Sequence, residues 1–322
     1  MYKILVIYNP KANRGRNVLI AKELRELTES INNSGAGIAI DWSSTQYPRH
    51  ATELAAGAVQ DGTAYRRVIA VGGDGTLNEI VNGIMQIPAG DRPQFGIVPV
   101  GSGNDFVKGV KHSVPIIPED ARLAFENALR QQEVETHRID VGYLRLGNQP
   151  LRYWCNVVGV GFDAAVGLQA LRINWLRGQA MYFLAAVRTI IENYDAPHLD
   201  MDIDGVALSQ RVQMLTIGNG TREGGGFITT PTARPDDGLL DYAMFEPMSR
   251  PMMVRLIPEV MRGTHGKFRQ VRMGTMKRMQ IRSDPQARLL VHADGEIVVG
   301  YEDHSVRDIE VGVLPGALSL VC

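Results

Sequence analysis

The sequence predicts two domains, the first an α/β domain with an open parallel sheet and the second a β-rich antiparallel sandwich. Three observations lead to this prediction. The chain has 322 residues, which exceeds one typical domain length. Strand and helix patterns alternate up to about residue 135, and short strands dominate beyond it. We therefore place the domains at residues 1–135 and 136–311.

The first domain opens with a continuous apolar run, residues 2–8, which is typical of a buried parallel strand. Apolar residues then recur at helical spacing from Ile20 to Ile31. Further strands are expected at 38–42, 68–71 and 95–100, and further helices after Pro48 and after Gly75. This order implies a right-handed parallel sheet, which binds ligands at the carboxyl ends of its strands.

The second domain is predicted from short strand patterns. Strands are expected at residues 138–144, 153–158, 199–203, 212–217, 239–245, 276–282 and 288–292. Two helical segments, near 174–191 and 251–261, interrupt them.

Composition excludes several classes of protein. Lysine plus arginine (34) nearly balance aspartate plus glutamate (35), so the net charge of −1 gives no reason to expect nucleic acid as a partner. Cys155 and Cys322 form no metal-ligand pattern, which argues against zinc or a disulfide and favours a cytoplasmic protein. No stretch approaches the roughly 18 apolar residues of a membrane span. We interpret the apolar N-terminus as a first strand, not a signal peptide.

A glycine-rich loop, residues 72–79, follows the expected strand at 68–71 and opens a helix. Glycine lets the backbone approach a ligand, and the free N–H groups of a helix start attract phosphate. One such loop is more often an ordinary turn, and its spacing matches neither a Walker A loop nor a dinucleotide fingerprint. Asp74 is unusual there, because a carboxylate repels phosphate unless Mg²⁺ intervenes or the group transfers a proton.

A second loop of this kind, residues 99–106, follows the next strand and adds Ser102 and Asp105. Two such loops in neighbouring βα units are unlike a pair of ordinary turns. Residues 9–16, after the first strand, add Lys11, Arg14 and Arg16 at the same edge, where each is equally well a phosphate ligand or a solvated surface charge.

These segments resemble a known family. Asn9-Pro10, the Gly-Gly-Asp-Gly-Thr-Leu-Asn-Glu loop at 72–79 and the Gly-Ser-Gly-Asn-Asp-Phe loop at 101–106 are similar to the diacylglycerol kinase catalytic domain, in particular that of bacterial soluble lipid kinases. The resemblance continues through Gly224-Gly225-Gly226-Phe227, Asp236-Asp237-Gly238-Leu239 and Asp294-Gly295-Glu296. It therefore covers nearly the whole chain.

The resemblance implies ATP and Mg²⁺ as partners in the reaction. The implied nucleotide-binding residues are Asn9, Pro10, Lys11, Ala12, Asn13, Thr45, Gly73, Asp74, Gly75, Thr76, Leu77, Asn78, Glu79 and Ser102. It also implies an active site in the cleft between the two domains, and a C-terminal segment, about 312–322, that packs back onto the first.

The resemblance also implies two metal sites and a base. Asp74 and Asp105, supported by Asp140, would hold catalytic Mg²⁺ through water, and Arg234, Asp237 and Leu239 would form a structural Mg²⁺ site, the first and last through backbone carbonyls. Glu296 would accept the proton of the lipid hydroxyl. The candidate catalytic residues are Glu296, Asp74 and Asp294.

The residues alone leave alternatives open. Asp294-Gly295 by itself favours an ordinary hairpin turn, and either Glu296 or Asp74 could be the base. The apolar segments at 175–187 and 252–261, edged with arginine, suit a membrane contact or acyl groove, but more often form core helices. The seven histidines are scattered, and we interpret them as structural or solvated.

The sequence therefore predicts an ATP-dependent, Mg²⁺-dependent kinase that transfers the γ-phosphate to a lipid hydroxyl, such as that of diacylglycerol. Such a protein would be cytoplasmic and would visit the membrane surface transiently. An NAD kinase-like phosphotransferase and a non-catalytic nucleotide- or lipid-binding module are the alternatives. The acceptor lipid and the oligomeric state are left open.

Overall fold

The structure, a computed structural model, divides into two compact units. Unit 1 comprises Met1–Val107, Lys111–Ile139 and Gly316–Cys322, and unit 2 comprises Lys108–Val110 and Asp140–Pro315. The residues that the structure describes are 2–12, 17–33, 37–59, 64–110, 117–129, 136–176, 178–192, 195–284, 286–303 and 305–321. The boundary expected near residue 135 lies outside the described residues.

Unit 1 is built on a parallel sheet with the strand order β2-β1-β3-β4. Its strands are β1 (Tyr2–Tyr8), β2 (Ile38–Ser44), β3 (Arg67–Gly72) and β4 (Gln94–Pro99). The C-terminal end of β16 (Asp308–Val321) adds a further parallel neighbour to β4, pairing Leu320 with Phe95. The predicted open parallel sheet is confirmed.

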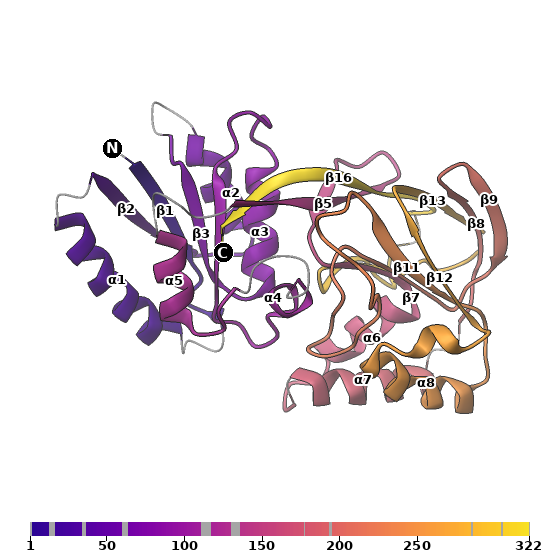
Figure 1. The fold of residues 1–322 in the computed structure, drawn as a ribbon. Coiled ribbons are helices and arrows are strands. Elements are labelled where there is room, and N and C mark those ends of the chain that lie inside the picture. The colour runs from indigo at the N-terminus through magenta and orange to yellow at the C-terminus, as the bar shows by residue number, and fades with distance from the viewer. Residues whose placement is uncertain are drawn as a thin grey trace. The chain divides into compact units, whose positions relative to one another are not determined.

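Helices cover both faces of this sheet, as Figure 1 shows in indigo and purple. The helices of unit 1 are α1 (Asn17–Asn33), α2 (His50–Ala56), α3 (Asp74–Ile84) and α5 (Ala121–Leu129), with a 3₁₀ turn at Gly57–Val59. Side chains alternate along β1, so Ile4 and Val6 join α1 and α5 in one core cluster, while Leu5 and Ile7 are buried on the opposite face. The carboxyl ends of the strands are thereby left for the loops.

Arg67 ties three elements of unit 1 together. This side chain, 2% exposed at the start of β3, donates to Oε1 of Gln94 on β4 at 3.1 and 2.7 Å and to the Ala128 carbonyl on α5. Tyr2 of β1 donates its hydroxyl to the same Gln94 oxygen at 3.1 Å. Burial lowers the pKa of the Arg67 guanidinium, so these hydrogen bonds offset a desolvation cost.

Unit 2 contains two antiparallel layers. One is a six-stranded sheet of order β12-β11-β10-β7-β14-β15: Val271–Met276, Leu240–Phe245, Met214–Gly218, Val157–Gly161, Val291–Ala293 and Glu296–Val299. The other contains β16, β13 (Arg278–Ser283), β8 (His198–Ile203) and β9 (Val206–Arg211), with β5 (Thr136–Leu146) beside β16 and β6 (Arg152–Trp154) beside β5. One core cluster joins the two layers, with Val158 and Leu215 from the first and Met279 and Val311 from the second. The predicted antiparallel sandwich is confirmed.

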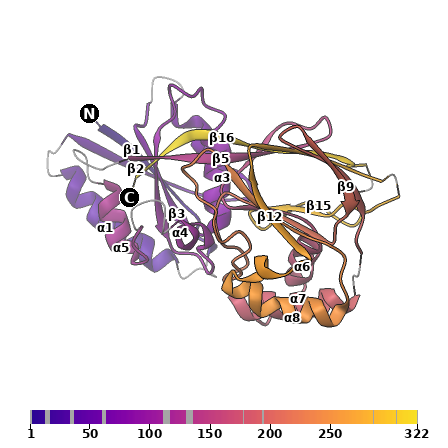
Figure 2. The same cartoon turned by 45° about the vertical axis from the view of Figure 1, so that its right-hand side comes forward.

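Three helices cover the outer face of the six-stranded sheet, grouped together in Figures 1 and 2. They are α6 (Phe162–Leu171), α7 (Gly178–Glu192) and α8 (Arg250–Arg262). Two shorter helical elements are α4 (Asp105–Gly109) and a 3₁₀ turn at His265–Lys267. Ile190 of α7 and Leu256 of α8 pack with Ala243 of β11. No helix among the described residues is long and apolar enough to cross a membrane.

Two strand predictions in unit 2 are wrong in the same way. The strand expected at 153–158 breaks into β6 and β7, because the carboxylate of Asp294 takes the N–H groups of Cys155, Asn156 and Val157. The strand expected at 276–282 breaks after β12, because Asp204 accepts the N–H groups of residues 277 and 278 at 2.8–3.2 Å. In both places a carboxylate replaces ladder hydrogen bonds. Helices α4, α5 and α6 and strands β9, β12 and β16 were not among the predicted elements.

Replacing Arg67 with alanine should lower the free energy of unfolding by roughly 3 kcal/mol, because buried acceptors lose a charged donor and the site loses packing. Urea unfolding followed by circular dichroism measures this. Arg66→Ala is the matched control. Arg66 is the exposed neighbour of Arg67, so its replacement should change the free energy of unfolding by less than about 0.5 kcal/mol. Equal losses in the two variants would contradict the anchoring role of Arg67.

Candidate functional site

The glycine loops of unit 1 meet backbone to backbone. They follow the neighbouring strands β3 and β4, and the N–H of Val100 donates to the carbonyl of Gly72 at 3.0 Å. A Cβ added at Gly101 would lie 2.4 Å from Cα of Gly73, far inside van der Waals contact. Neither position can therefore carry a side chain without moving the other loop, and backbone rather than side chains lines this edge of the sheet.

Two carboxylates gather beside these loops. Asp74 occupies the first turn of α3, and its Oδ1 accepts the N–H of Phe106 at 3.2 Å. Asp105, 9% exposed, begins α4. The Oδ2 atoms of both residues lie within 3.4 Å of the position that a Cβ on Gly103 would take. The structure thus brings together the two acidic residues that the sequence singled out in separate loops.

The segment after β1 joins the same edge. The amide of Asn9 donates to the Thr76 hydroxyl at 3.4 Å, and Oδ1 of Asn9 accepts the N–H of Lys11 at 2.9 Å. Thr45 follows β2, and its N–H donates to the carbonyl of Tyr8 at 2.9 Å. Asn13, together with Arg14 and Arg16, lies outside the described residues.

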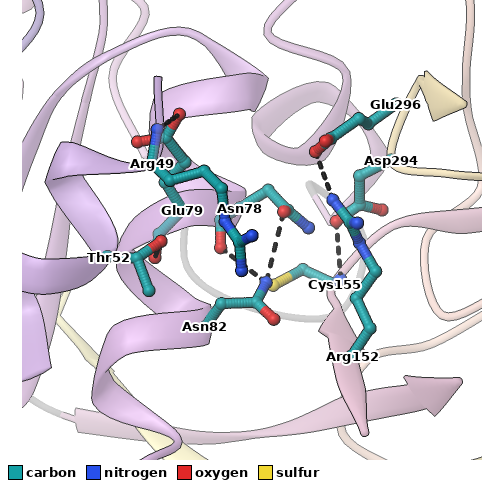
Figure 3. Close-up of polar contacts among 9 residues, drawn as sticks. All are labelled: Arg49, Thr52, Asn78, Glu79, Asn82, Arg152, Cys155, Asp294 and Glu296. Atoms are coloured by element: carbon teal, nitrogen blue, oxygen red, sulfur yellow. Dashed lines mark hydrogen bonds and ion pairs between the residues drawn. The ribbon is translucent and has the colours of Figure 1, made fainter. Parts of the chain in front are cut away.

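Other predicted nucleotide residues differ in exposure. Gly75, Lys11 and Ser102 are exposed, while Thr76, Leu77 and Asn78 are buried in α3. Pro10 and Ala12 are half-buried after β1. The Asn78 side chain accepts from Asn82 at 3.2 Å, one helical turn on (Figure 3).

The carboxylate of Glu79 caps a neighbouring helix. Its oxygens accept the N–H groups of Arg49 at 3.0 Å and Ala51 at 3.2 Å, and its carbonyl accepts the Thr52 hydroxyl at 2.9 Å. Figure 3 draws Glu79 with Arg49 and Thr52. Arg49, at the N-cap of α2, has a φ of 69° and makes no side-chain cap of its own. Glu79 thus satisfies donors at the start of α2 that would otherwise lack partners.

In unit 2, Asp294 is held by a row of backbone donors. The Asp294-Gly295 turn, with φ of 48° and 79°, joins β14 to β15. The Asp294 carboxylate accepts the N–H groups of Cys155 and Asn156 at 2.9 Å and of Val157 at 3.0 Å, as Figure 3 shows in part. Three charge-assisted hydrogen bonds to one carboxylate fix the base of the turn. Burial raises the pKa of the Cys155 thiol, and the nearby charge of Asp294 raises it further.

Glu296 extends from the end of this turn toward solvent. Its side chain is 57% exposed and pairs with the guanidinium of Arg152 on β6 (Figure 3). Sequence reasoning did not single out Arg152, because the two residues lie 144 positions apart. The pair orients Glu296, but at this exposure it adds little to stability.

The loop before β11 carries the other predicted metal residues. Asp237 is exposed and its Oδ1 accepts the N–H of Leu239 at 3.0 Å, while Arg234 pairs with Asp236 at 3.2 Å. Asp140, 2% exposed, accepts the N–H of Gly238 at 2.7 Å and so supports this loop.

A buried cluster in unit 2 was missed. Nε2 of His292 lies 3.6 Å from Oδ2 of Asp163 and 3.4 Å from Oε2 of Glu223. Burial alone would lower the pKa of His292, but the two carboxylates outweigh it and raise the pKa to about 10. Burial, followed by the charge of Asp163, raises the pKa of Glu223 to about 7. The alternation Val291-His292-Ala293 was the available signal, because it turns His292 away from the sandwich core.

Two family descriptions match consecutive parts of the chain. Residues 3–144 match the diacylglycerol kinase catalytic domain, and residues 156–322 match the YegS C-terminal NAD kinase beta sandwich-like domain. The chain belongs to the diacylglycerol kinase catalytic-domain family. It is accordingly a lipid kinase, a phosphotransferase with an alcohol acceptor.

Curated relatives of this lipid kinase agree with the assignment. It is 27% identical to the diacylglycerol kinase of Mycobacterium tuberculosis over 84% of this chain and 81% of the relative. It is 34% identical to the "Probable lipid kinase YegS-like" of Chromohalobacter salexigens over 68% of this chain and 65% of the relative.

A solved structure of a diacylglycerol kinase from Bacillus anthracis str. Sterne has the same fold. The TM-score is 0.66 at 19% identity, over 99% of this chain and 96% of that one.

In this lipid kinase, Asp294→Ala should lower the free energy of unfolding by roughly 3 kcal/mol, because three backbone N–H groups lose a charged acceptor. Urea unfolding of Asp294→Ala and of the control variant Glu296→Gln, in the same turn, measures this loss. The exposed Glu296–Arg152 pair should be worth less than about 1 kcal/mol. Losses of equal size would show that the hydrogen bonds to Asp294 do not anchor the turn.

Proposed function

We propose that this lipid kinase transfers the γ-phosphate of ATP to the hydroxyl of a lipid alcohol such as diacylglycerol, with Mg²⁺. The observation that carries the proposal is the close contact of Gly73 with Gly101, which places backbone and two aspartates at one edge of the unit 1 sheet. Phosphoryl transfer requires positioning and charge neutralisation of the triphosphate rather than covalent chemistry from the protein.

The proposed ATP site combines the glycine loops with the start of α3. The N–H groups of the first turn of α3 and the helix dipole favour phosphate. Asn9, hydrogen-bonded to Thr76, orders the segment that carries Lys11, whose charge would act on the same phosphates. Asn13 and Thr45 remain part of the proposed site.

Asp74 and Asp105 suit Mg²⁺, which prefers oxygen ligands and keeps several of its waters. Their Oδ2 atoms lie close to one point beside Gly103, so one hydrated ion could contact both carboxylates. Mg²⁺ bound there would neutralise charge on the triphosphate. The same carboxylates would repel ATP that arrives without a metal.

We assign the proton acceptor to Glu296 and a positioning role to Asp294. Glu296 is exposed, and Arg152 pairs with one of its carboxylate oxygens. The other oxygen would accept a hydrogen bond from the substrate hydroxyl. Asp294 already accepts three backbone hydrogen bonds, so its contribution is to hold the turn that presents Glu296. Asp74 is assigned to the metal rather than to the proton.

A structural Mg²⁺ site is proposed at Asp237, with the backbone carbonyls of Arg234 and Leu239. Asp237 is the charged ligand, and the Asp140–Gly238 hydrogen bond holds the loop in shape. Oxygen ligands from one loop fit a hard cation.

Access to a lipid acceptor is proposed through the outer surface of α7, α8 and the segment before α7. Their inner faces are core, as residues such as Ile190 and Leu256 show. Trp175, Phe183 and Val254 are nevertheless 67%, 45% and 49% exposed. Exposed aromatic and aliphatic side chains near arginines suit transient binding to a membrane surface, and we propose that the protein is cytoplasmic between such visits.

Transfer of label from γ-labelled ATP to lipids in mixed micelles, with NAD in a parallel tube, tests the proposal. The wild type should label a lipid and not NAD. Asp74→Asn should reduce transfer to background because the metal loses a charged ligand, and Glu296→Gln should lower kcat by roughly 10²–10⁴-fold as expected for loss of a general base. Glu302→Gln, an exposed carboxylate outside the site, is the control and should be unchanged.

Labelled NAD with unlabelled lipid would assign the chain to NAD phosphorylation instead. ATP-dependent thermal stabilisation without transfer to any acceptor would favour a non-catalytic binding module. Full activity in Asp74→Asn would remove the proposed metal role of this residue.

The structural Mg²⁺ site predicts that Mg²⁺ raises the melting temperature and that Asp237→Ala reduces the rise, because the loop loses its charged ligand. Differential scanning calorimetry with and without Mg²⁺ measures it. Asp236→Ala is the matched control, since this neighbour is not a proposed ligand and should keep the rise. The same Mg²⁺ response in all three proteins would rule out a metal at Asp237.

A further inference from the structure

Asp163, Glu223 and His292 form a compact group under α6, on the outer face of the six-stranded sheet of unit 2. We call this group the acid-histidine cluster. His292 lies on β14 between two residues of the sandwich core, so it points to the opposite face, where α6 packs. Asp163 is in the first turn of α6, and Glu223 comes from the segment between β10 and β11.

The two distances from Nε2 of His292 suit coordination better than hydrogen bonding. Nε2 of His292 lies 3.6 and 3.4 Å from the nearest oxygens of Asp163 and Glu223, and all three atoms lie within 4.8 Å of one another. Good N–H···O bonds measure about 2.7–3.2 Å. Ligands at about 2.0–2.1 Å from a tetrahedral cation are separated by about 3.3–3.4 Å. Both distances from Nε2 are close to the second value.

The acid-histidine cluster is buried and places two carboxylates against one imidazole. The side chains of His292, Asp163 and Glu223 are 6%, 11% and 14% exposed, and two carboxylates face at most one positive charge. Oε1 of Glu223 is buried without a hydrogen-bond partner among the described residues. Buried polar atoms are normally satisfied, so this carboxylate calls for a further partner.

We propose that Asp163, Glu223 and His292 bind one divalent transition-metal cation of the Zn²⁺ or Mn²⁺ class. One imidazole and two carboxylates suit such borderline cations, and a fourth ligand such as water would complete the coordination. The site shares no residue with the proposed Mg²⁺ sites, and it does not depend on the proposed ATP chemistry.

The surroundings of the cluster fit this role. The Thr216 hydroxyl donates to Oδ2 of Asp163 at 2.6 Å, which orients that carboxylate as outer-shell hydrogen bonds orient metal ligands. Gly159 lies against the cluster, because a Cβ there would be 2.2 Å from Nε2 of His292 and 2.4 Å from Oδ2 of Asp163. A bound cation would join α6, the Glu223 segment and β14, the strand that leads into the Asp294 turn.

The test is Zn²⁺ binding to the full chain after removal of metals with a chelator. Isothermal titration with Zn²⁺ is run in excess Mg²⁺, which occupies sites that prefer hard oxygen ligands. The wild type should bind one equivalent of Zn²⁺, and its melting temperature should rise by several degrees. Glu223→Gln and His292→Gln should each weaken binding by at least about 100-fold, because each removes a ligand. Circular dichroism checks that the variants are folded.

His198→Gln is the matched control. His198 lies 4.0 Å from Asp200 on β8, and their side chains are 42% and 64% exposed, so the pair offers a histidine and an aspartate without burial and without a third ligand among the described residues. This variant should bind Zn²⁺ as the wild type does. If His292→Gln does not fold, the proposal is tested by the Zn²⁺ affinity of the nearly isosteric Glu223→Gln variant and by the number of Zn²⁺ equivalents that the wild type binds. Less than one equivalent of Zn²⁺ in the wild type, or unchanged affinity in a folded Glu223→Gln, would overturn the proposal.

Discussion

The contact between the backbones of Gly73 and Gly101 is the constraint on which the proposed phosphate-binding edge depends. Two neighbouring βα turns can approach this closely only without side chains, since a Cβ at Gly101 would lie 2.4 Å from Cα of Gly73. The contact places Asp74 and Asp105 beside one another, because each follows its glycine by one or a few residues. Backbone amides, a helix start and two carboxylates are thus concentrated at one sheet edge.

Unit 2 uses carboxylates in another way, as substitutes for backbone partners. Asp294 takes three successive N–H groups between β6 and β7, and Asp204 takes two between β12 and β13. Each interrupts a strand without leaving buried donors unsatisfied. In unit 1, Glu79 does the same for the start of α2.

Sequence reasoning found the parts of the candidate site that depend on local pattern. The loops at 72–79 and 99–106 and the Asp294-Gly295 turn were predicted because glycine and aspartate have strong local preferences. The unbroken strands expected at 153–158 and 276–282 were wrong, since β propensity does not report a distant carboxylate that competes for N–H groups. The acid-histidine cluster was missed because each of its members is unremarkable alone.

The sequence by itself determined the alternation of strands and helices, the glycine turns and the family. Only the tertiary structure decided which polar groups are partners: Asp294 with Cys155 across 139 residues, Glu296 with Arg152 across 144, and His292 with Asp163 and Glu223. Local pattern reports the backbone conformation that a segment prefers, whereas long-range hydrogen bonds and charge pairs depend on burial and register, which arise when the sheets form.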